Sequence, residues 1–247
     1  MAFMTGRHVL LTGASSGVGR HLAKSLAREG AHISCCARRR AELDSLVAEI
    51  EAAGGKANAQ VCDVGDADSI VAAFDGAEAA AGLVDSVICN AGINVAGPAH
   101  SITVEDLDRI MSINLRGAFL TAQQGAKRMI ASGKPAGEKP RRVIFIASIL
   151  GRKAATGTAI YSATKAGVLM LTQSLALEWA RHQINVNAIL PGYMPTDIVE
   201  EWFASRPGQD RLMPVNDLDP GLKFLLSSEA RSVSGTEIVI DDTQRFA

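Results

Sequence analysis

Tyr161 and Lys165 lie four residues apart in a segment whose apolar residues recur with helical spacing, so both should project from one helix face. A free phenol has a pKa of about 10, which is too high for a base at neutral pH. A nearby ammonium group favours the phenolate and lowers that pKa by roughly 1–3 units. The pair is therefore predicted to exchange a proton with a bound molecule. A solvated helix face is the alternative interpretation of the same spacing.

Two further polar side chains occur where they could join that chemistry. Ser148 follows the apolar run Val143–Ala147, and a hydroxyl at a strand end can donate a hydrogen bond to an oxygen that gains negative charge. Asn114 lies inside a helical pattern, where asparagine competes for backbone hydrogen bonds. Each also has an ordinary structural alternative, a strand-end cap for Ser148 and a packing role for Asn114.

A glycine-rich turn follows the first apolar run, over Thr12–Gly19, and leads into a helical pattern. Glycines let the backbone approach a pyrophosphate closely, and the N–H groups at the start of the helix then face the anion. The spacing is Gly-x-x-x-Gly-x-Gly, which differs from the Gly-x-Gly-x-x-Gly of other dinucleotide-binding folds. Tight packing of the strand against the helix is the alternative explanation for these glycines.

Three arginines follow the second predicted strand, at the start of the next helix. An NAD site usually has an acidic residue at this strand end. Cations at a helix N-terminus oppose the helix dipole, and the 2′-phosphate of NADP would relieve that conflict. We predict that Arg38 is the main phosphate contact and Arg39 the second, so that NADP(H) is preferred to NAD(H). Pairing of the arginines with Glu42 and Asp44 is the alternative.

Short β-type runs alternate with helical patterns along the whole chain. The expected strands are His8–Leu11, His32–Ala37, Ala57–Cys62, Ser86–Cys89, Val143–Ala147, Asn185–Leu190 and Glu237–Ile240. The expected helices are Val18–Glu29, Arg40–Ala53, Asp66–Ala80, Val104–Ala131, Ala159–Arg181 and Leu218–Ser227. Near-continuous apolar strands are typical of a sheet covered on both faces. The predicted fold class is α/β, with residues 1–247 in a single-domain Rossmann-type doubly wound parallel sheet of about seven strands and helices on both faces.

The composition argues against several classes of function. A formal net charge of -1 and a pI of about 6.5 give no basic face for nucleic acid or a membrane surface. The four cysteines lie in apolar runs without a Cys-x-x-Cys pair, which indicates buried thiols in a reducing compartment. The five histidines lack metal-ligand spacing. Without a signal peptide or apolar span in the sequence, a cytoplasmic protein is expected.

In their order along the chain, these motifs resemble the short-chain dehydrogenase/reductase family over nearly the whole length. The matching stretches are Thr12–Gly19, Asp63-Val64, Asn90-Ala91-Gly92, Asn114, Ser148, Tyr161-x-x-x-Lys165 and Pro191-Gly192 with Thr196. The resemblance implies Asn114, Ser148, Tyr161 and Lys165 as the catalytic residues, with no metal. It implies cofactor contacts at Gly13, Ser15, Ser16, Gly17, Val18, Gly19, Asp63, Val64, Asn90, Ala91, Gly92, Tyr161, Lys165, Pro191, Gly192 and Thr196, to which the charges after the second strand add Arg38 and Arg39.

The resemblance also implies roles for these residues. Lys165 would hydrogen-bond the nicotinamide ribose, and Asn114 would order a water that relays protons to that lysine. The expected activity is that of a carbonyl reductase, in which NADP(H) exchanges a hydride with a ketone/secondary alcohol pair and Tyr161 is the general acid/base. A non-catalytic NADP(H)-binding regulator and an epimerase or lyase on the same fold are the alternatives. A homodimer or homotetramer is expected through the long helices.

The substrate region departs from the family pattern. Asp242 and Thr243 stand where the family usually has two glycines, so the C-terminal turn is expected to be reshaped. A small substrate lid is expected near residues 193–215. Its Trp202 could equally pack in the core. Pocket-lining residues are predicted at Ile149, Leu150, Tyr193 and Met194, with a surface aromatic as the alternative for Tyr193. The apolar residues of the segment Asp197–Met213, which includes Trp202 and Phe203, favour an uncharged or partly apolar substrate.

Overall fold

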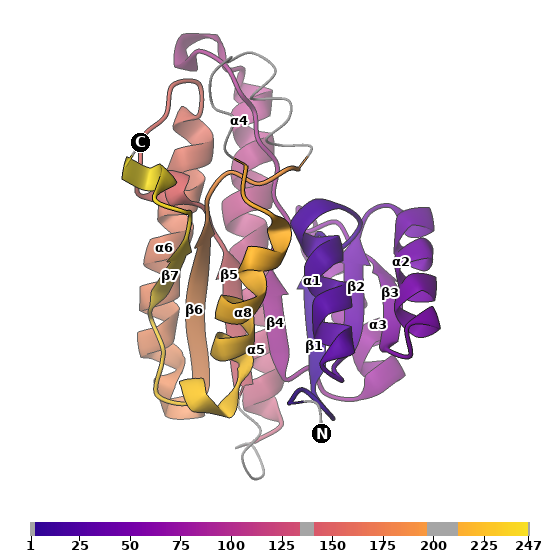
Figure 1. Cartoon of the computed structure of the whole chain (residues 1–247). Helices are drawn as coiled ribbons and strands as arrows, with labels where there is room; N and C mark the ends of the chain where they lie inside the picture. The colour runs from indigo at the N-terminus through magenta and orange to yellow at the C-terminus, as the bar shows by residue number, and fades with distance from the viewer. Residues whose placement is uncertain (1–2, 134–140, 197–211, 247) are drawn as a thin grey trace.

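The strand signals of the sequence assemble into one parallel sheet with the order β3-β2-β1-β4-β5-β6-β7 (Figure 1). The computed structural model describes residues 3–133, 141–196 and 212–246. Its seven strands are β1 (His8–Thr12), β2 (His32–Ala37), β3 (Lys56–Val61), β4 (Ser86–Cys89), β5 (Arg141–Ile146), β6 (Ile184–Pro191) and β7 (Glu237–Ile240). The predicted Rossmann-type, doubly wound α/β domain is confirmed.

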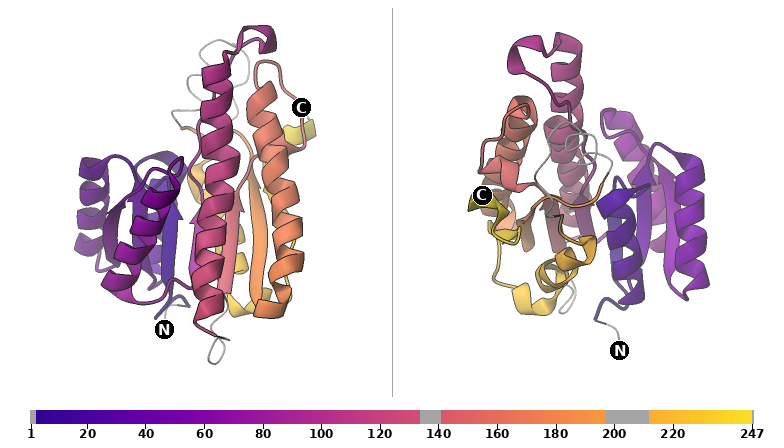
Figure 2. Two further views of the ribbon diagram at one scale, coloured as in Figure 1. Left: turned by 180° about the vertical axis from the view of Figure 1, so that it is seen from behind. Right: turned by 45° about the horizontal axis from the view of Figure 1, so that its top comes forward.

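Helices cover both faces of the sheet (Figures 1 and 2). The α-helices are α1 (Gly17–Arg28), α2 (Arg40–Ala52), α3 (Ala67–Ala81), α4 (Val104–Met111), α5 (Ala118–Ala131), α6 (Ala159–Trp179) and α8 (Asp219–Leu226). Helices α1, α2 and α8 pack into one hydrophobic cluster and helices α3, α5 and α6 into another. Each β-α-β connection therefore crosses one face of the sheet and returns to a parallel strand.

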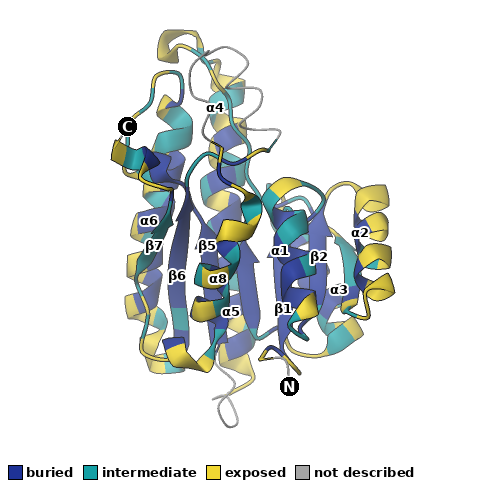
Figure 3. Cartoon of the chain, viewed as in Figure 1, coloured by how far each residue is buried: buried dark blue, intermediate teal, exposed yellow. Residues whose placement is uncertain are grey.

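The two clusters draw alternate side chains from the same strands. Along β1, Val9 and Leu11 join the cluster under α1, whereas Leu10 joins the one under α3. Side chains of a strand point alternately to opposite faces, so a strand buried on both sides must be apolar at nearly every position. All five residues of β1 are buried, as are all six of β5 (Figure 3). This explains the continuous apolar runs in the sequence.

The strand order reverses between β1 and β4, which lie side by side in the centre of the sheet. The connection from β1 leads outward to β2 and β3, and the connections from β4 lead the other way to β5, β6 and β7. Helices on opposite faces diverge at such a point and leave a crevice at the carboxyl ends of the strands. The glycine turn follows β1, Asn90 follows β4, and Ser148 lies just beyond β5, all at this edge.

The predicted helix Val104–Ala131 is wrong in one respect, because it is not a continuous α-helix. Residues Ser112–Gly117 form a π-helix between α4 and α5. Gly117 lies against the loop after β3, where a Cβ would stand 2.6 Å from the Val64 carbonyl oxygen. A π turn accommodates one more residue than an α turn and often marks a functional site. Here it contains Asn114, whose side chain is buried.

Several structural features bear on the classes considered from composition. In the described part of the chain, no helix is both long and apolar enough to span a membrane. The same residues contain no cluster of three or more potential metal ligands. All four cysteines are buried and free, and burial raises the pKa of the Cys62 thiol to about 11. These thiols are therefore core side chains that stay protonated at neutral pH.

Candidate active site

A cleft of about 470 Å³ opens above the carboxyl ends of the strands, at the point where the strand order reverses. All the residues predicted to contact a cofactor line it, from Gly13–Gly19 through Arg38 and Arg39 to Thr196. Ser148, Tyr161 and Lys165 line it as well. Asn114 is buried behind the lining residues. Positions spread across the whole sequence therefore converge on one crevice.

The glycine turn forms one wall of the cleft through close backbone packing. Gly13 has a φ of 69°, and a Cβ there would lie 2.8 Å from the Ala91 Cα atom. Gly19 packs so tightly against the Gly13 carbonyl that any side chain would collide with it. Asn90 holds the turn from β4, because its Nδ2 donates to the Thr12 carbonyl oxygen over 2.9 Å. Only glycine fits these positions.

The first turn of α1 is open to an anion. Ser16 is the N-cap residue, but its side chain makes no capping hydrogen bond, and the first turn carries no acidic residue. The N–H groups at this helix start therefore lack a side-chain acceptor in the described structure. The Thr196 methyl carbon Cγ2 lies 3.4 Å from a Cβ built at Gly17, so Thr196 is next to the start of α1. The open backbone donors of this first turn suit a phosphate.

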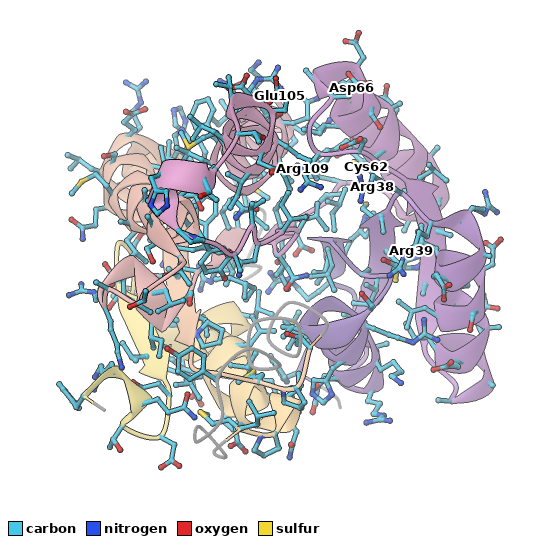
Figure 4. The ribbon with its side chains drawn as sticks, turned by 90° about the horizontal axis from the view of Figure 1, so that it is seen from above. Arg38, Arg39, Cys62, Asp66, Glu105 and Arg109 are labelled. Atoms are coloured by element: carbon cyan, nitrogen blue, oxygen red, sulfur yellow. The ribbon has the colours of Figure 1, made fainter. Side chains whose placement is uncertain are left out.

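The arginines after β2 do not share one environment (Figure 4). Arg40 pairs with Asp44 at 2.8 Å, one turn along the same helix. Arg39 donates to the Ser15 hydroxyl of the glycine turn over 3.0 Å. Arg38 is exposed at the cleft, and among the described residues neither Arg38 nor Arg39 forms an ion pair with a carboxylate. The predicted alternative, pairing on a solvated face, therefore holds for Arg40 alone.

At the other end of the cleft, α6 presents Tyr161 and Lys165 together. The Lys165 Nζ atom lies 5.6 Å from the centroid of the Tyr161 ring, so the two side chains share a helix face. Lys165 is buried, and its Nζ donates to the Ile146 carbonyl oxygen over 2.9 Å. Ser148, just beyond β5, lies near enough to the Tyr161 side chain to lower the pKa of the phenol, and its Oγ accepts from the Leu150 N–H over 3.1 Å. The phenol, the hydroxyl and the ammonium group therefore form one cluster.

The protonation of this pair differs from the sequence-based prediction. Burial raises the pKa of Tyr161 to about 12, and the hydrogen bond from Ser148 only partly opposes this. Burial also lowers the pKa of Lys165 to about 8, so the lysine remains mostly an ammonium at neutral pH. The prediction that Lys165 brings the phenol below its ordinary pKa is thus wrong for the side chains of this chain by themselves. Desolvation of the phenolate is the main cause of the raised pKa.

Asn114 supports the cleft from behind. Its Oδ1 accepts from the Ile93 backbone N–H over 2.8 Å, and its Nδ2 donates to the Ile93 carbonyl oxygen over 2.8 Å. A Cβ at Gly92 would lie 3.5 Å from Asn114 Oδ1 and 3.7 Å from Lys165 Nζ. The π-helix thus turns Asn114 toward the lysine and fixes the loop after β4.

Comparison with known proteins agrees with this geometry. Residues 7–207 match the family model described as short chain dehydrogenase. The chain belongs to the short-chain dehydrogenase/reductase family. It is 34% identical to gluconate 5-dehydrogenase of Gluconobacter oxydans, over 96% of this chain and 94% of that protein. It is also 34% identical to 3beta-hydroxysteroid dehydrogenase 1 of Eggerthella lenta, over 96% and 93% of the two chains.

Solved structures agree as well. A short-chain dehydrogenase from Burkholderia cenocepacia in complex with NADP superposes with a TM-score of 0.85 at 30% identity, covering 97% of this chain and 98% of that one. A short-chain type dehydrogenase/reductase from Mycobacterium marinum gives a TM-score of 0.87 at 32% identity, covering 96% and 95%. This short-chain dehydrogenase/reductase is therefore an oxidoreductase of a family that binds nicotinamide dinucleotides.

The C-terminal turn departs from the short-chain dehydrogenase/reductase pattern in sequence but keeps a left-handed backbone. Asp242 and Thr243 have φ values of 44° and 65°, the region that glycine normally occupies. The Asp241 carboxylate stabilises the turn by accepting from the Thr243 and Arg245 N–H groups over 3.2 and 2.9 Å. Asp242 and Thr243 therefore adopt backbone angles that glycine would favour, and the Asp241 carboxylate holds them there.

This turn places Gln244 against Tyr193, a residue that lines the cleft. The buried Gln244 Oε1 accepts from the Tyr193 N–H over 2.6 Å, and its backbone carbonyl accepts from Lys153 Nζ over 2.9 Å. Gly192 lies so close that a Cβ there would stand 2.9 Å from the Asp241 Cα atom. The C-terminus thus fixes the segment after β6, a link between distant positions that no sequence signal indicated.

Of the predicted substrate-pocket residues, some line the cleft, one is buried elsewhere and the rest lie outside the described part of the chain. Leu150, Tyr193 and Met194 line the cleft, whereas Ile149 is buried in the core under α6. Residues 197–211 of the expected lid, with Trp202 and Phe203, lie outside the described residues. Sequence reasoning missed Ile93, Asn94 and Thr158, which also line the cleft. Asn94 could have been found by its place two residues after the Asn-Ala-Gly stretch.

Proposed function

We propose that this chain is an NADP(H)-dependent oxidoreductase that interconverts a ketone and a secondary alcohol, with Tyr161 as general acid and base. One observation carries the proposal. The phenol of Tyr161 lies with Ser148 and Lys165 at one end of the same cleft that has the glycine turn at its other end. A proton donor, a hydrogen-bond donor for an oxyanion and a dinucleotide site are thereby aligned.

The choice of NADP(H) over NAD(H) is supported by the end of β2. Arg38 and Arg39 line the cleft without a carboxylate partner in the described structure, and no acidic residue occupies the strand end. Glycine positions that a Cβ would fill and the uncapped start of α1 fit the pyrophosphate. Gly13, Ser15–Gly19, Asp63, Val64, Asn90–Gly92, Pro191, Gly192 and Thr196 would complete the contacts.

When bound, the nicotinamide supplies or accepts the hydride. In reduction, the Ser148 hydroxyl donates to the carbonyl oxygen, and Tyr161 gives that oxygen its proton. The raised pKa of Tyr161 keeps it protonated and ready to donate at neutral pH. Lys165, still largely cationic there, favours the phenolate that remains and would hydrogen-bond the ribose. Asn114 fixes the Ile93 backbone beside the lysine and would order a water there.

The decisive experiment is a panel of ketones with NADPH, followed by its loss of absorbance, and the chirality of the alcohol formed from the best substrate. NADPH consumption with formation of a secondary alcohol is expected. Tight NADPH binding without turnover of any carbonyl would instead identify a non-catalytic regulator. Conversion of a substrate without net change of NADPH would identify an epimerase or lyase on this fold.

The remaining expectations belong to the same proposal. Residues 1–247 form one NADP(H)-binding catalytic domain with a substrate lid near 193–215. We expect a homodimer or homotetramer through the outer faces of α5 and α6, where Ile130, Met170 and Leu177 are exposed. The four free thiols are compatible with a cytoplasmic protein. Light scattering in solution would test the assembly.

A further inference from the structure

A residue that lines the cleft carries an orphaned polar atom. Among the residues that the structure describes, Asn94 Oδ1 is the one buried side-chain oxygen or nitrogen without a hydrogen-bond partner. Asn94 also lines the cleft. A buried amide oxygen left without a donor costs about 1–3 kcal/mol. Such an atom in a ligand cleft indicates a donor that arrives with the ligand.

The loop after β4 holds Asn94 in a defined place. Just before it, Ile93 is fixed through both its N–H and its carbonyl by Asn114. Just after it, the Gly97 N–H donates to the Gly157 carbonyl oxygen over 3.1 Å, next to the Thr158 that precedes α6. Asn94 therefore lies in a loop that is held by Asn114 and by the segment that precedes α6, the helix that carries Tyr161.

We propose that Asn94 Oδ1 accepts a hydrogen bond from a second hydroxyl group of the substrate, beside the carbon that reacts. The inference rests on the proposed ketone/alcohol chemistry and narrows its substrate to hydroxy ketones and the matching vicinal diols. The reacting oxygen itself is served by Tyr161 and Ser148, so it leaves Asn94 unsatisfied. A hydroxyl on the neighbouring carbon is a neutral donor and needs no charged partner.

A site that hydrogen-bonds a substrate hydroxyl discriminates strongly against the analogue that lacks it, because the buried acceptor then stays unpaired. Acetone and hydroxyacetone differ by that one group, as do isopropanol and propylene glycol. We expect kcat/KM for hydroxyacetone to exceed that for acetone by about 10-fold or more. Propylene glycol should bind the protein saturated with NADP⁺ more tightly than isopropanol by a similar factor.

Three variants isolate the acceptor. Asn94→Leu keeps the size of the side chain but removes the oxygen, and should bring both ratios close to one. Asn94→Asp keeps acceptor oxygens and should preserve the preference for the hydroxylated ligand. Asn216→Leu makes the same exchange at an exposed asparagine that does not line the cleft, and should leave the ratios unchanged.

Turnover is followed by NADPH absorbance and binding of the two alcohols by ligand-observed NMR. A preference for propylene glycol over isopropanol that disappears in Asn94→Leu supports the subsite. If in addition neither ketone is reduced, the proposed activity is contradicted while the subsite stands. Reduction of both ketones without a preference overturns the Asn94 assignment and leaves the activity standing. A change confined to NADPH affinity in Asn94→Leu would assign the atom to the cofactor and also overturn the proposal.

Discussion

The two ends of the cleft are built differently. The glycine-turn end depends on close backbone packing at Gly13 and Gly19, and the Asn90 side chain, which follows β4, holds the turn. The Tyr161 end depends on buried polar side chains that hydrogen-bond backbone groups, with Gln244 on Tyr193, Asn114 on Ile93 and Lys165 on Ile146. In the proposed function, the first end holds a group common to many enzymes and the second binds a particular substrate.

The largest effect is expected at the Tyr161 end. Tyr161→Phe removes the proton donor and should lower turnover by roughly 10²- to 10⁴-fold, the usual share of a general acid. NADPH binding, which depends mainly on the other end, should remain, as measured by fluorescence titration. Substantial turnover in this variant would mean that another group supplies the proton. The assignment of proton transfer to the Tyr161 end would then be wrong.

The pH dependence of turnover also tests the role of Tyr161 as the proton donor. Because burial raises the pKa of Tyr161 to about 12, the phenol is protonated at neutral pH. Reduction needs the protonated form and should stay nearly flat from neutral pH to about pH 8, above which Lys165 loses the charge that favours the phenolate. Over the same range, oxidation of the alcohol needs the phenolate, so its kcat/KM should rise about tenfold per pH unit. An oxidation rate that falls as pH rises over this range would contradict the assignment.

At the glycine-turn end, steric fit can be separated from backbone strain. Gly13→Ala places a Cβ 2.8 Å from Ala91 Cα at a φ of 69°, and should weaken NADPH binding, since the turn must open. Overpacking costs about 1–3 kcal/mol, which corresponds to roughly 10- to 100-fold in affinity. Gly54→Ala has a comparable φ of 81° with nothing within 4 Å, and is the matched control. Equal effects on NADPH affinity would exclude collision as the cause.

Cofactor selectivity should depend on Arg38. Arg38→Asp replaces a cation by an anion where the 2′-phosphate is proposed to lie, and should narrow or reverse the preference for NADPH over NADH. A charge-assisted hydrogen bond of about 1.5–3 kcal/mol corresponds to roughly 10- to 100-fold in relative affinity. Arg40→Asp, at a residue already paired with Asp44, should change selectivity far less. Equal NADPH and NADH affinities in the unmutated protein would refute the prediction.

The smallest effect concerns the C-terminal turn. Gln244→Ala leaves the Tyr193 N–H without its 2.6 Å acceptor and loosens the cleft wall after β6. Substrate KM should rise several-fold with little change in NADPH affinity, at a stability cost of about 1–3 kcal/mol. Gln173→Ala, at an exposed glutamine whose amide bonds Glu237 over 3.4 Å, is the control for thermal unfolding and KM. Loss of NADPH affinity instead of KM would show that the two ends are not separable.

The sequence predicted local features well where one physical signal dominates. The bounds of β2, β4 and β7 agree with the expected ranges, and for β2 and β4 the signal was an apolar run that is buried between helices on both faces. It did not predict the π-helix at Ser112–Gly117, since a π turn has no distinct propensity and is fixed by the contact of Gly117 with Val64. The same holds for Gln244, which meets Tyr193 only after both segments have folded against β6 and β7.

By itself, the sequence determined the α/β class and the alternation of strands and helices along the chain. It also determined the glycine turn and the spacing that puts Tyr161 and Lys165 on one helix face. These follow from periodicity and from backbone constraints within short stretches. Only the tertiary structure decided the protonation of the pair and the orphaned oxygen of Asn94, because desolvation depends on every atom packed around a group. Burial is a property of the assembled fold, and no short stretch of residues carries it.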